Sequence, residues 1–274
     1  MYSRVYVEIT NCCNRACSFC PGTLRKPKLL TMEEFRCITG KLEGITQYLY
    51  LHVMGEPLLH PELPEFIRYA TGKGFKVILT TNGTLLKKRE KELLASGIYK
   101  INVSLHSFEE GTGKEQEDYI AECISFADSA SASGILVILR LWNEGTDGGR
   151  NDRTTALLKE KFPEDWSMDA RGARIRPKLH LEYGKRFDWP DRDATDYGNE
   201  VFCYGLKDHF GILSDGTVIP CCLDREGVIA LGNIFESSIE EILASDRAKR
   251  MADGFRCRTA VEDLCKKCGY ARRF

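Results

Sequence analysis

The sequence lacks an apolar run long enough to cross a bilayer, and its N-terminal stretch MYSRVYVEIT has the pattern of a strand rather than of a signal peptide. We therefore expect a cytoplasmic protein that does not associate with membranes.

An excess of charge is also missing, since the net charge is -1 and both signs are mixed along the chain. This balance argues against a general nucleic-acid-binding role. Internal repeats and low-complexity tracts are absent as well, so the 274 residues are expected to form one large domain with at most a small appendage.

Cysteine, in contrast, is abundant and clustered. Of 12 cysteines, four lie within residues 12–20 and six within residues 203–268. A disulfide framework is unusual in a reducing compartment for a chain of this length. Two separate thiolate metal sites fit the grouping better. The remaining two, Cys37 and Cys123, fall in predicted helices and are expected to be ordinary buried residues.

Strand and helix patterns alternate along the chain and predict an α/β fold. The predicted strands are 5–10, 48–54, 76–82, 101–107, 135–143 and about 175–183, and the predicted helices are 31–42, 61–72, 84–96, 116–131 and 153–161. Thr31 and Glu34 form a capping box at the start of the first helix. Such alternation implies right-handed βαβ units and a parallel sheet, which either a doubly wound sheet or a partial barrel satisfies.

The chemistry-bearing motifs follow the predicted strands, at the sheet edge where functional groups of such folds lie. They are the cysteine loop and the segments 54–57, 81–83, 104–107 and 140–143. Cys13, Cys17 and Cys20 supply three thiolates in eight residues, and thiolate is the ligand for iron-sulfur clusters. Three ligands on a four-iron cluster leave one iron open for a substrate or cofactor. Counting from Cys12 instead gives the spacing of a plant-type ferredoxin, so a ferredoxin-like electron carrier is an alternative.

The C-x3-C-x2-C motif, directly after a strand and with Phe19 before its last cysteine, resembles that of the radical S-adenosylmethionine (radical SAM) superfamily. The resemblance covers most of residues 5–143 and implies a partial (β/α)6 barrel with a parallel sheet. It also implies a catalytic 4Fe-4S cluster on Cys13, Cys17 and Cys20 that binds S-adenosylmethionine (AdoMet), with Phe19 at the cofactor site.

The same resemblance assigns further cofactor contacts. Gly55 and Glu56 would contact the methionine amino group, although Met54 stands where the family usually has another glycine. Ser104 would contact the ribose, and Arg140 the methionine carboxylate or ribose. Ser104 could instead be a small residue on an inward strand face, and Arg140 could pair with a nearby carboxylate.

The second cysteine group is predicted to bind metal through Cys203, Cys221, Cys265 and Cys268, with Cys222 and Cys257 as substitutes. Residues 211–221 form a predicted hairpin that delivers Cys221, and a helix is predicted near 238–250. Four thiolates can hold structural zinc or a fully ligated cluster, and the spacing leaves both open.

This second pattern resembles the SPASM/twitch branch of the radical SAM superfamily, which implies one auxiliary 4Fe-4S cluster in a small twitch-type domain. We expect a radical SAM core at residues 1–200 and the auxiliary domain at 201–274. Overall length and cysteine layout are most similar to those of the anaerobic 2-deoxy-scyllo-inosamine dehydrogenases, which oxidise a secondary alcohol.

The resemblance implies an oxidoreductase that cleaves AdoMet to a 5'-deoxyadenosyl radical, abstracts a substrate hydrogen and passes a second electron to the auxiliary cluster. An external one-electron donor such as flavodoxin or ferredoxin would reduce it. A small alcohol or sugar-like substrate is expected, with modification of a ribosomally made peptide as the alternative. Residues 171–186 contain six Lys and Arg residues, a pattern that suits an anionic substrate group or an ordinary solvated loop. No catalytic acid or base is evident.

Overall fold

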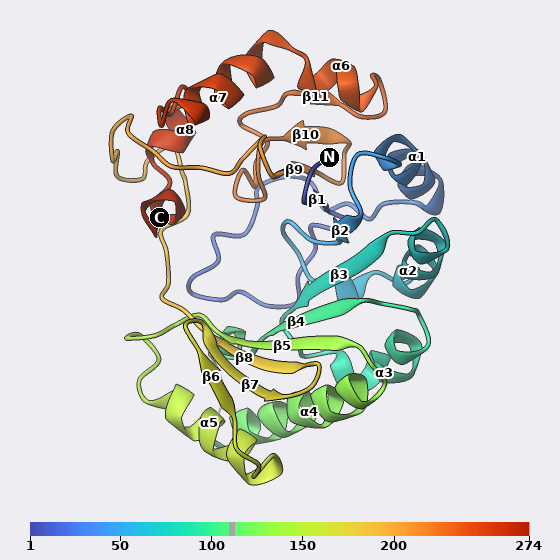
Figure 1. The fold of residues 1–274 in the computed structure, drawn as a ribbon, viewed down its shortest axis with the longest axis vertical. Coiled ribbons are helices and arrows are strands. Elements are labelled where there is room, and N and C mark those ends of the chain that lie inside the picture. Colours follow the sequence, from blue (N-terminus) through green and yellow to red (C-terminus); the bar gives the residue numbers. More distant parts are fainter. Residues whose placement is uncertain (110–112, 274) are drawn as a thin grey trace. The chain divides into compact units, whose positions relative to one another are not determined.

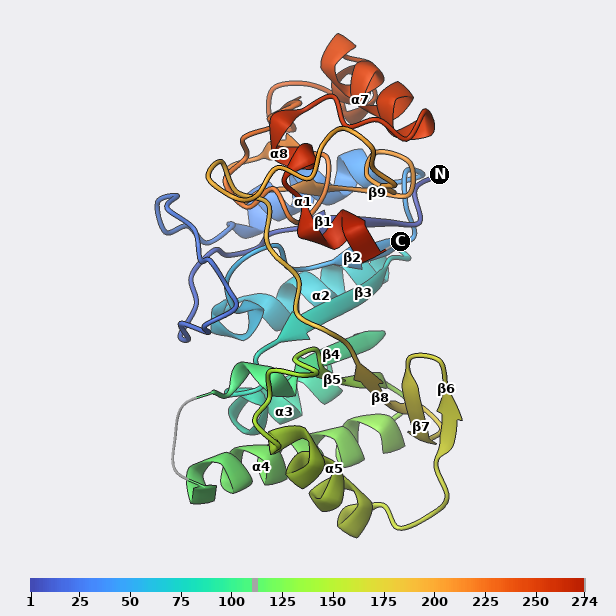
Figure 2. The same ribbon diagram turned by 90° about the vertical axis from the view of Figure 1, so that its left-hand side faces the viewer.

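The computed structural model describes residues 1–109 and 113–273, which are drawn as ribbons in Figures 1 and 2. The chain divides into two compact units. The first unit comprises Met1–Cys13, Pro21–Gly55 and Phe187–Phe274, and the second comprises Asn14–Cys20 and Glu56–Arg186. Within the described ranges, no helix combines the length and the apolar character that a membrane span requires.

The first unit contains strands in the order β11-β10-β9-β1-β2. These strands are β1 (Arg4–Val7), β2 (Tyr48–Tyr50), β9 (His209–Ile212), β10 (Thr217–Ile219) and β11 (Gly232–Asn233). β1 pairs in parallel with β2 and also with β9, so that the N-terminal strand lies between an early and a late part of the chain. β9 and β10 are antiparallel and form the predicted hairpin.

The helices of the first unit are α1 (Met32–Leu42), α6 (Ile239–Leu243), α7 (Asp246–Arg256), α8 (Asp263–Lys266) and the 3-10 helix η3 (Gly269–Arg273). α1 begins with the predicted capping box of Thr31 and Glu34. The single helix predicted near 238–250 is wrong. Ser238 caps α6 and Ser245 caps α7, and the second cap starts a new helix where a continuous one was expected.

The second unit contains a mainly parallel set of strands in the order β3-β4-β5-β8-β7-β6. The strands are β3 (Lys76–Thr81), β4 (Lys100–Ser104), β5 (Leu136–Leu141), β6 (Ser167–Asp169), β7 (Gly172–Arg176) and β8 (Leu179–Tyr183). β3, β4, β5 and β8 are parallel, and β6 and β7 are antiparallel additions at the edge. The single strand predicted at about 175–183 is wrong, because Lys178 has a φ of 66° and the chain turns there between β7 and β8.

The helices of the second unit are η1 (Pro57–Leu59), α2 (Leu63–Gly72), α3 (Leu86–Leu94), η2 (Leu105–Ser107), α4 (Gly113–Ala132) and α5 (Arg150–Lys161). α2, α3 and α4 run along one side of β3, β4 and β5 (Figure 1), and α4 also packs against α5 (Figure 2). The predicted α/β class with a parallel sheet is confirmed. Because β3, β4, β5 and β8 are parallel, their carboxyl ends share one edge, where the motifs of this unit lie.

Candidate cluster and cofactor sites

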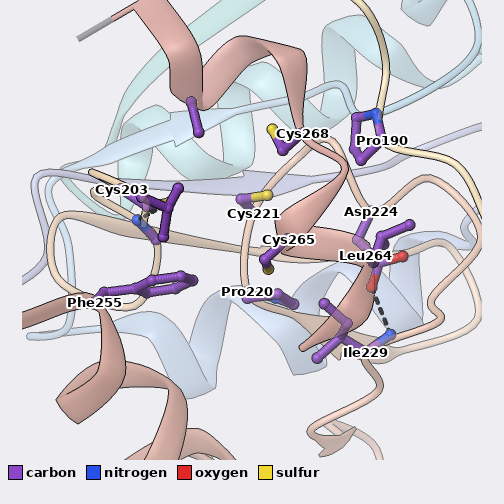
Figure 3. Close-up of a pocket in the computed structure, with 13 residues that line it drawn as sticks. Pro190, Cys203, Pro220, Cys221, Asp224, Ile229, Phe255, Leu264, Cys265 and Cys268 are labelled. Atoms are coloured by element: carbon purple, nitrogen blue, oxygen red, sulfur yellow. Dashed lines mark hydrogen bonds between the residues drawn. The ribbon is translucent and has the colours of Figure 1, made fainter. Parts of the chain in front are cut away.

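The predicted tail ligands meet in one cavity of the first unit. Cys203, Cys221, Cys265 and Cys268 all line it (Figure 3), together with mainly apolar side chains such as that of Phe255. The cavity encloses about 430 Å³ of space that protein atoms do not fill, part of it open to solvent. None of these four cysteines forms a disulfide, so all four sulfurs are available as thiolate ligands.

Separate elements deliver these four thiols. Cys203 precedes β9, Cys221 lies two residues after the end of β10, Cys265 lies in α8, and Cys268 lies between α8 and η3. The backbone amide of Gly205 donates to Cys203 Sγ at 3.3 Å. Such a donor stabilises a thiolate and is also found around iron-sulfur clusters. The arrangement therefore offers four thiolate donors to one group.

Burial raises the pKa of each of these thiols. The pKa of Cys203 rises to about 11, and Cys221 and Cys265 have pKa values well above the usual range, because burial and the neighbouring thiolates both disfavour a negative charge. A bound cationic metal centre reverses this preference, since it stabilises every thiolate that it contacts. The donor set thus fits an iron-sulfur cluster. Within the described residues, no three His, Cys, Asp or Glu side chains are placed to hold a single metal ion. In a 4Fe-4S cluster each thiolate binds a different iron, so the sulfurs do not have to surround one ion.

The other cysteines lie elsewhere. Cys222 packs against the cluster of Val53, Met54, Leu213 and Ile219 and hydrogen-bonds with Tyr6. Cys257 is exposed, and neither it nor Cys222 lines the cavity. Cys123 is buried as predicted, whereas the prediction for Cys37 is wrong: it is exposed, because its position in α1 faces away from the buried side of that helix.

The N-terminal motif lies in an accessible loop. Cys13 and Cys20 are exposed and Cys17 is half-buried, and none belongs to a helix or strand. In the second unit, Cys17 Sγ lies 3.4 Å from the Ser107 carbonyl oxygen, just beyond β4. Three thiols in a loop with no regular structure of its own are suited to bind a cluster that then orders the loop.

A polar network that the sequence did not reveal holds the second half of this loop. The Ser18 amide and hydroxyl both donate to the Glu109 carboxylate, at 2.5 and 2.7 Å. Arg186 forms an ion pair with Glu109 and donates to the Ser18 hydroxyl. In the sequence, Arg186 stands out only as part of the basic run 171–186, and nothing local marks Glu109, since its partners are distant in the chain.

Phe19 packs against the same edge. Its ring centroid lies 4.9 Å from that of His106, and the Arg186 guanidinium lies 5.3 Å from the Phe19 ring. His106 Nδ1 lies 3.0 Å from the Arg140 carbonyl oxygen and 3.3 Å from the Trp142 amide nitrogen. Burial lowers the pKa of His106 to about 4, so its imidazole is neutral at pH 7. Phe19 thus belongs to an ordered aromatic and cationic cluster, and its contact with a cofactor stays a prediction.

Gly55 lies against the backbone before the cysteine motif. A Cβ atom at Gly55 would lie 2.5 Å from the Thr10 carbonyl oxygen and 2.8 Å from that of Cys12. Its φ of 79° is also in the left-handed region. Both facts require glycine here, so the segment after β2 fits closely under the residues that lead into Cys13.

Glu56 is fully buried at the start of η1. Its carboxylate accepts from the Leu58 amide at 3.0 Å, the Thr81 hydroxyl at 2.7 Å and the Asn82 amide at 2.6 Å. Burial raises the pKa of Glu56 to about 7 despite these donors. A carboxylate has about four acceptor sites, so one remains for a ligand amino group. The predicted AdoMet contact stays a prediction.

Ser104, Arg140 and Glu182 stand in one row across β4, β5 and β8, because each is in register with the next. Arg140 Nε lies 3.4 Å from a Glu182 carboxylate oxygen, and its guanidinium lies 4.5 Å from the Trp142 ring. The carboxylate partner considered for Arg140 is therefore present. The row provides a hydroxyl, a cation and an anion at the carboxyl edge of the strands.

The fold, the motif and the tail cavity define a class that comparisons with known proteins identify. A family model for the radical SAM superfamily matches residues 7–135, and the SPASM model, an iron-sulfur cluster-binding domain, matches residues 203–269. The GTP 3',8-cyclase of Aliarcobacter butzleri is 30% identical over 278 aligned residues, which cover 85% of this chain and 83% of that protein. The chain therefore belongs to the radical SAM superfamily.

Other relatives agree with this assignment. A probable GTP 3',8-cyclase of Sulfolobus acidocaldarius is 26% identical over 281 aligned residues, which cover 85% of each chain. A crystal structure of BtrN in complex with AdoMet and 2-DOIA covers 98% of this chain and 93% of its own, with a TM-score of 0.60 and 21% identity. SuiB of Streptococcus suis, bound to the precursor peptide SuiA, covers 98% of this chain and 71% of its own, with a TM-score of 0.57 and 15% identity. These structural likenesses show the fold alone.

The assignment confirms several predictions. The chain is a radical SAM enzyme with the barrel-like fold of that superfamily and a SPASM domain at its C-terminus, so the electron-carrier alternative is set aside. The superfamily implies a 4Fe-4S cluster and AdoMet, and the SPASM domain implies further iron-sulfur binding. The domain boundary at residue 200 and the individual ligands stay predictions.

Proposed function

We propose that this enzyme is a radical SAM oxidoreductase that oxidises a small alcohol or sugar-like substrate by two electrons. Cys13, Cys17 and Cys20 hold the catalytic cluster and leave one iron open for AdoMet. Cys203, Cys221, Cys265 and Cys268 hold one auxiliary 4Fe-4S cluster. The observation that carries the proposal is the convergence of four thiols in the tail cavity.

Four thiolates would be enough to ligate a 4Fe-4S cluster fully, so the auxiliary cluster would not bind substrate through an iron. Such a cluster is suited to electron transfer. With AdoMet bound, the catalytic cluster supplies the means to remove one hydrogen atom from the carbinol carbon. After loss of that hydrogen atom, the substrate reaches the ketone by giving up the hydroxyl proton to a base and one electron, which a cluster held by the four tail thiols would accept. An external flavodoxin or ferredoxin provides the first electron and takes up the last.

The chain's own side chains would bind and orient the reactants. Gly55 fixes the backbone beneath the cysteine loop, and Glu56 keeps one acceptor site for the AdoMet amino group. Ser104 and Arg140 stand side by side in the row that would bind the ribose and the carboxylate. The ring contact between the half-buried Phe19 and His106 covers part of this edge.

A second candidate substrate comes from the sequence relatives. Two proteins that align along most of their own length with this chain are named GTP 3',8-cyclase or probable GTP 3',8-cyclase. GTP is therefore tested beside the alcohol. A cyclisation does not oxidise its substrate by two electrons and passes no electron to an auxiliary acceptor, so the two candidates differ in what they require of the tail cluster.

The test compares product formation with AdoMet cleavage. Reconstituted enzyme is reduced with dithionite and supplied with AdoMet. The substrate is either the secondary alcohol 2-deoxy-scyllo-inosamine or GTP. We expect about one ketone per 5'-deoxyadenosine from the wild type. The Cys265→Ala, Cys268→Ala variant should release 5'-deoxyadenosine with little ketone, while a Cys257→Ala control keeps the wild-type ratio. An unchanged ratio in the double variant, or conversion of GTP alone, would contradict the oxidoreductase proposal.

A further inference from the structure

Glu8 is a fully buried carboxylate at the end of β1 and joins three separate segments of the first unit. Its oxygens accept from Arg25 at 2.6 Å, from the Met54 amide at 3.2 Å, and from the Ser214 amide and hydroxyl at 3.3 and 2.9 Å. Arg25 belongs to the segment that leaves the cysteine motif, and Ser214 belongs to the β9-β10 hairpin. A buried charge with one cationic partner is strongly destabilised when that partner is lost, so Arg25 is held firmly in place.

Arg25 also reaches the tail. Its Nε donates to the Arg225 carbonyl oxygen at 2.8 Å, while its terminal nitrogen pairs with Glu8. The neighbouring Leu24 amide donates to the Glu226 carboxylate at 3.1 Å. The segment 21–30 directly follows Cys20. It is therefore bonded to the tail at two neighbouring positions, Leu24 to Glu226 and Arg25 to Arg225.

Those two tail residues belong to the loop 221–229, which begins with a proposed ligand of the auxiliary cluster. Asp224 organises this loop: its amide donates to the Cys221 carbonyl, and its carboxylate accepts from the Val228 and Ile229 amides at 2.9 and 2.8 Å. Asp224 and Ile229 also line the cavity of the four thiols. The conformation of the loop therefore depends on what occupies that cavity, because a metal site and the loop that supplies its ligands fold together.

We infer that the auxiliary cluster orders the N-terminal cysteine loop through these contacts, with Arg25 as the positioning residue. An occupied tail cavity fixes the loop 221–229, which presents the Arg225 carbonyl and the Glu226 carboxylate to Leu24 and Arg25. The segment 21–30 is then held in the conformation that closes the catalytic cluster's loop. This inference rests on the ligands named in the proposed function but not on the auxiliary cluster's role as electron acceptor.

The test follows the stability of the catalytic cluster without any substrate. Reconstituted, reduced protein is mixed with an iron chelator, and the electron paramagnetic resonance signal that changes on AdoMet addition is followed with time. The Cys265→Ala, Cys268→Ala variant should lose this signal about tenfold faster than the wild type, which corresponds to about 1.4 kcal/mol, the order of one charge-assisted hydrogen bond. Arg25→Lys keeps a cation for Glu8 but cannot also reach the Arg225 carbonyl, and it should show a similar increase.

Combining the changes separates coupling from general weakening. In the Arg25→Lys background, removing the tail ligands should add less than about threefold, because the connection is already broken. Lys26→Ala, an exposed neighbour in the same segment, should behave as wild type. Glu226→Ala keeps all four tail ligands and should still accelerate loss of the catalytic cluster's signal. This variant therefore tests the inference even if the variant without Cys265 and Cys268 does not fold.

The inference fails if the tail variant or a folded Glu226→Ala protein loses the signal within about twofold of the wild-type rate, or if the effects of Arg25→Lys and the tail variant multiply. Failure of the proposed function is recorded separately, as an unchanged ratio of ketone to 5'-deoxyadenosine. Either result can occur without the other.

Discussion

Gly55→Ala tests how closely the segment after β2 fits beneath the cysteine loop. The added methyl group would lie 2.5 Å from the Thr10 carbonyl oxygen and 2.8 Å from that of Cys12. All of these are backbone atoms, so no side chain can rotate away. Gly44 provides a matched control, since its φ of 77° is close to the 79° of Gly55 and a Cβ there meets no atom within 4 Å.

The two substitutions share the cost of a left-handed backbone, about 1–2 kcal/mol for a residue with a Cβ. Gly55→Ala adds the cost of overpacking, about 1–3 kcal/mol. We therefore expect the free energy of unfolding to fall by about 1–2 kcal/mol in Gly44→Ala and by about 2–5 kcal/mol in Gly55→Ala. Relief of the clash must displace the backbone beside Cys13, so Gly55→Ala should also bind less iron in the N-terminal site.

Urea unfolding of the metal-free, reduced proteins measures the first effect, and iron content after reconstitution measures the second. Equal destabilisation by the two substitutions, within about 0.5 kcal/mol, would refute the argument from close contact. Normal iron content in a folded Gly55→Ala protein would refute the link to the cysteine loop.

Two further predictions concern the ligands and the buried acid. Cys13→Ala should abolish reductive cleavage of AdoMet, whereas Cys12→Ala should retain it, because only the former belongs to the C-x3-C-x2-C motif; the reverse result would favour the alternative spacing. The raised pKa of Glu56, about 7, means that the folded state binds a proton more tightly than the unfolded state, with its usual value of 4.5. Its contribution to stability is therefore present below about pH 4.5 and is lost as the pH rises through 7. Between pH 5 and pH 7.5 the urea-unfolding free energy of the metal-free wild type should fall by about 2.4 kcal/mol from this group, and Glu56→Gln should remove that fall. A variant whose stability depends on pH as steeply as that of the wild type would contradict this reasoning.

Much of the fold was predictable because its signals are local. The capping box of Thr31 and Glu34 involves residues three apart, and the strand patterns need only a few residues to be recognised. The two errors at 175–183 and 238–250 arose where a short-range signal competes with a periodic pattern. Lys178 turns the chain within an apparently continuous strand, and Ser245 restarts a helix that the pattern of residues would have continued.

The site was predictable where chemistry marks the residue type. Clustered cysteines singled out the four tail thiols that line one cavity. The residues that hold these loops carry no such mark, since common charged residues are usually exposed. Glu109 lies 91 residues from Ser18, and Glu8 lies 206 residues from Ser214. Only the folded chain reveals that these carboxylates are partners of loop residues.

The parallel pairing of β1 with β9 has a consequence for how the protein is made. Arg4 lies opposite His209, 205 residues later in the chain. At the usual ribosomal rate of about 5–20 residues per second, β1 waits for about 10–40 s before its neighbour is synthesised. During that time one edge of the strand has unpaired amide and carbonyl groups, which can pair with other chains. The cysteine loop that follows this strand is thus completed only when the last third of the polypeptide has emerged, so loading of the catalytic cluster is expected to come after translation rather than during it.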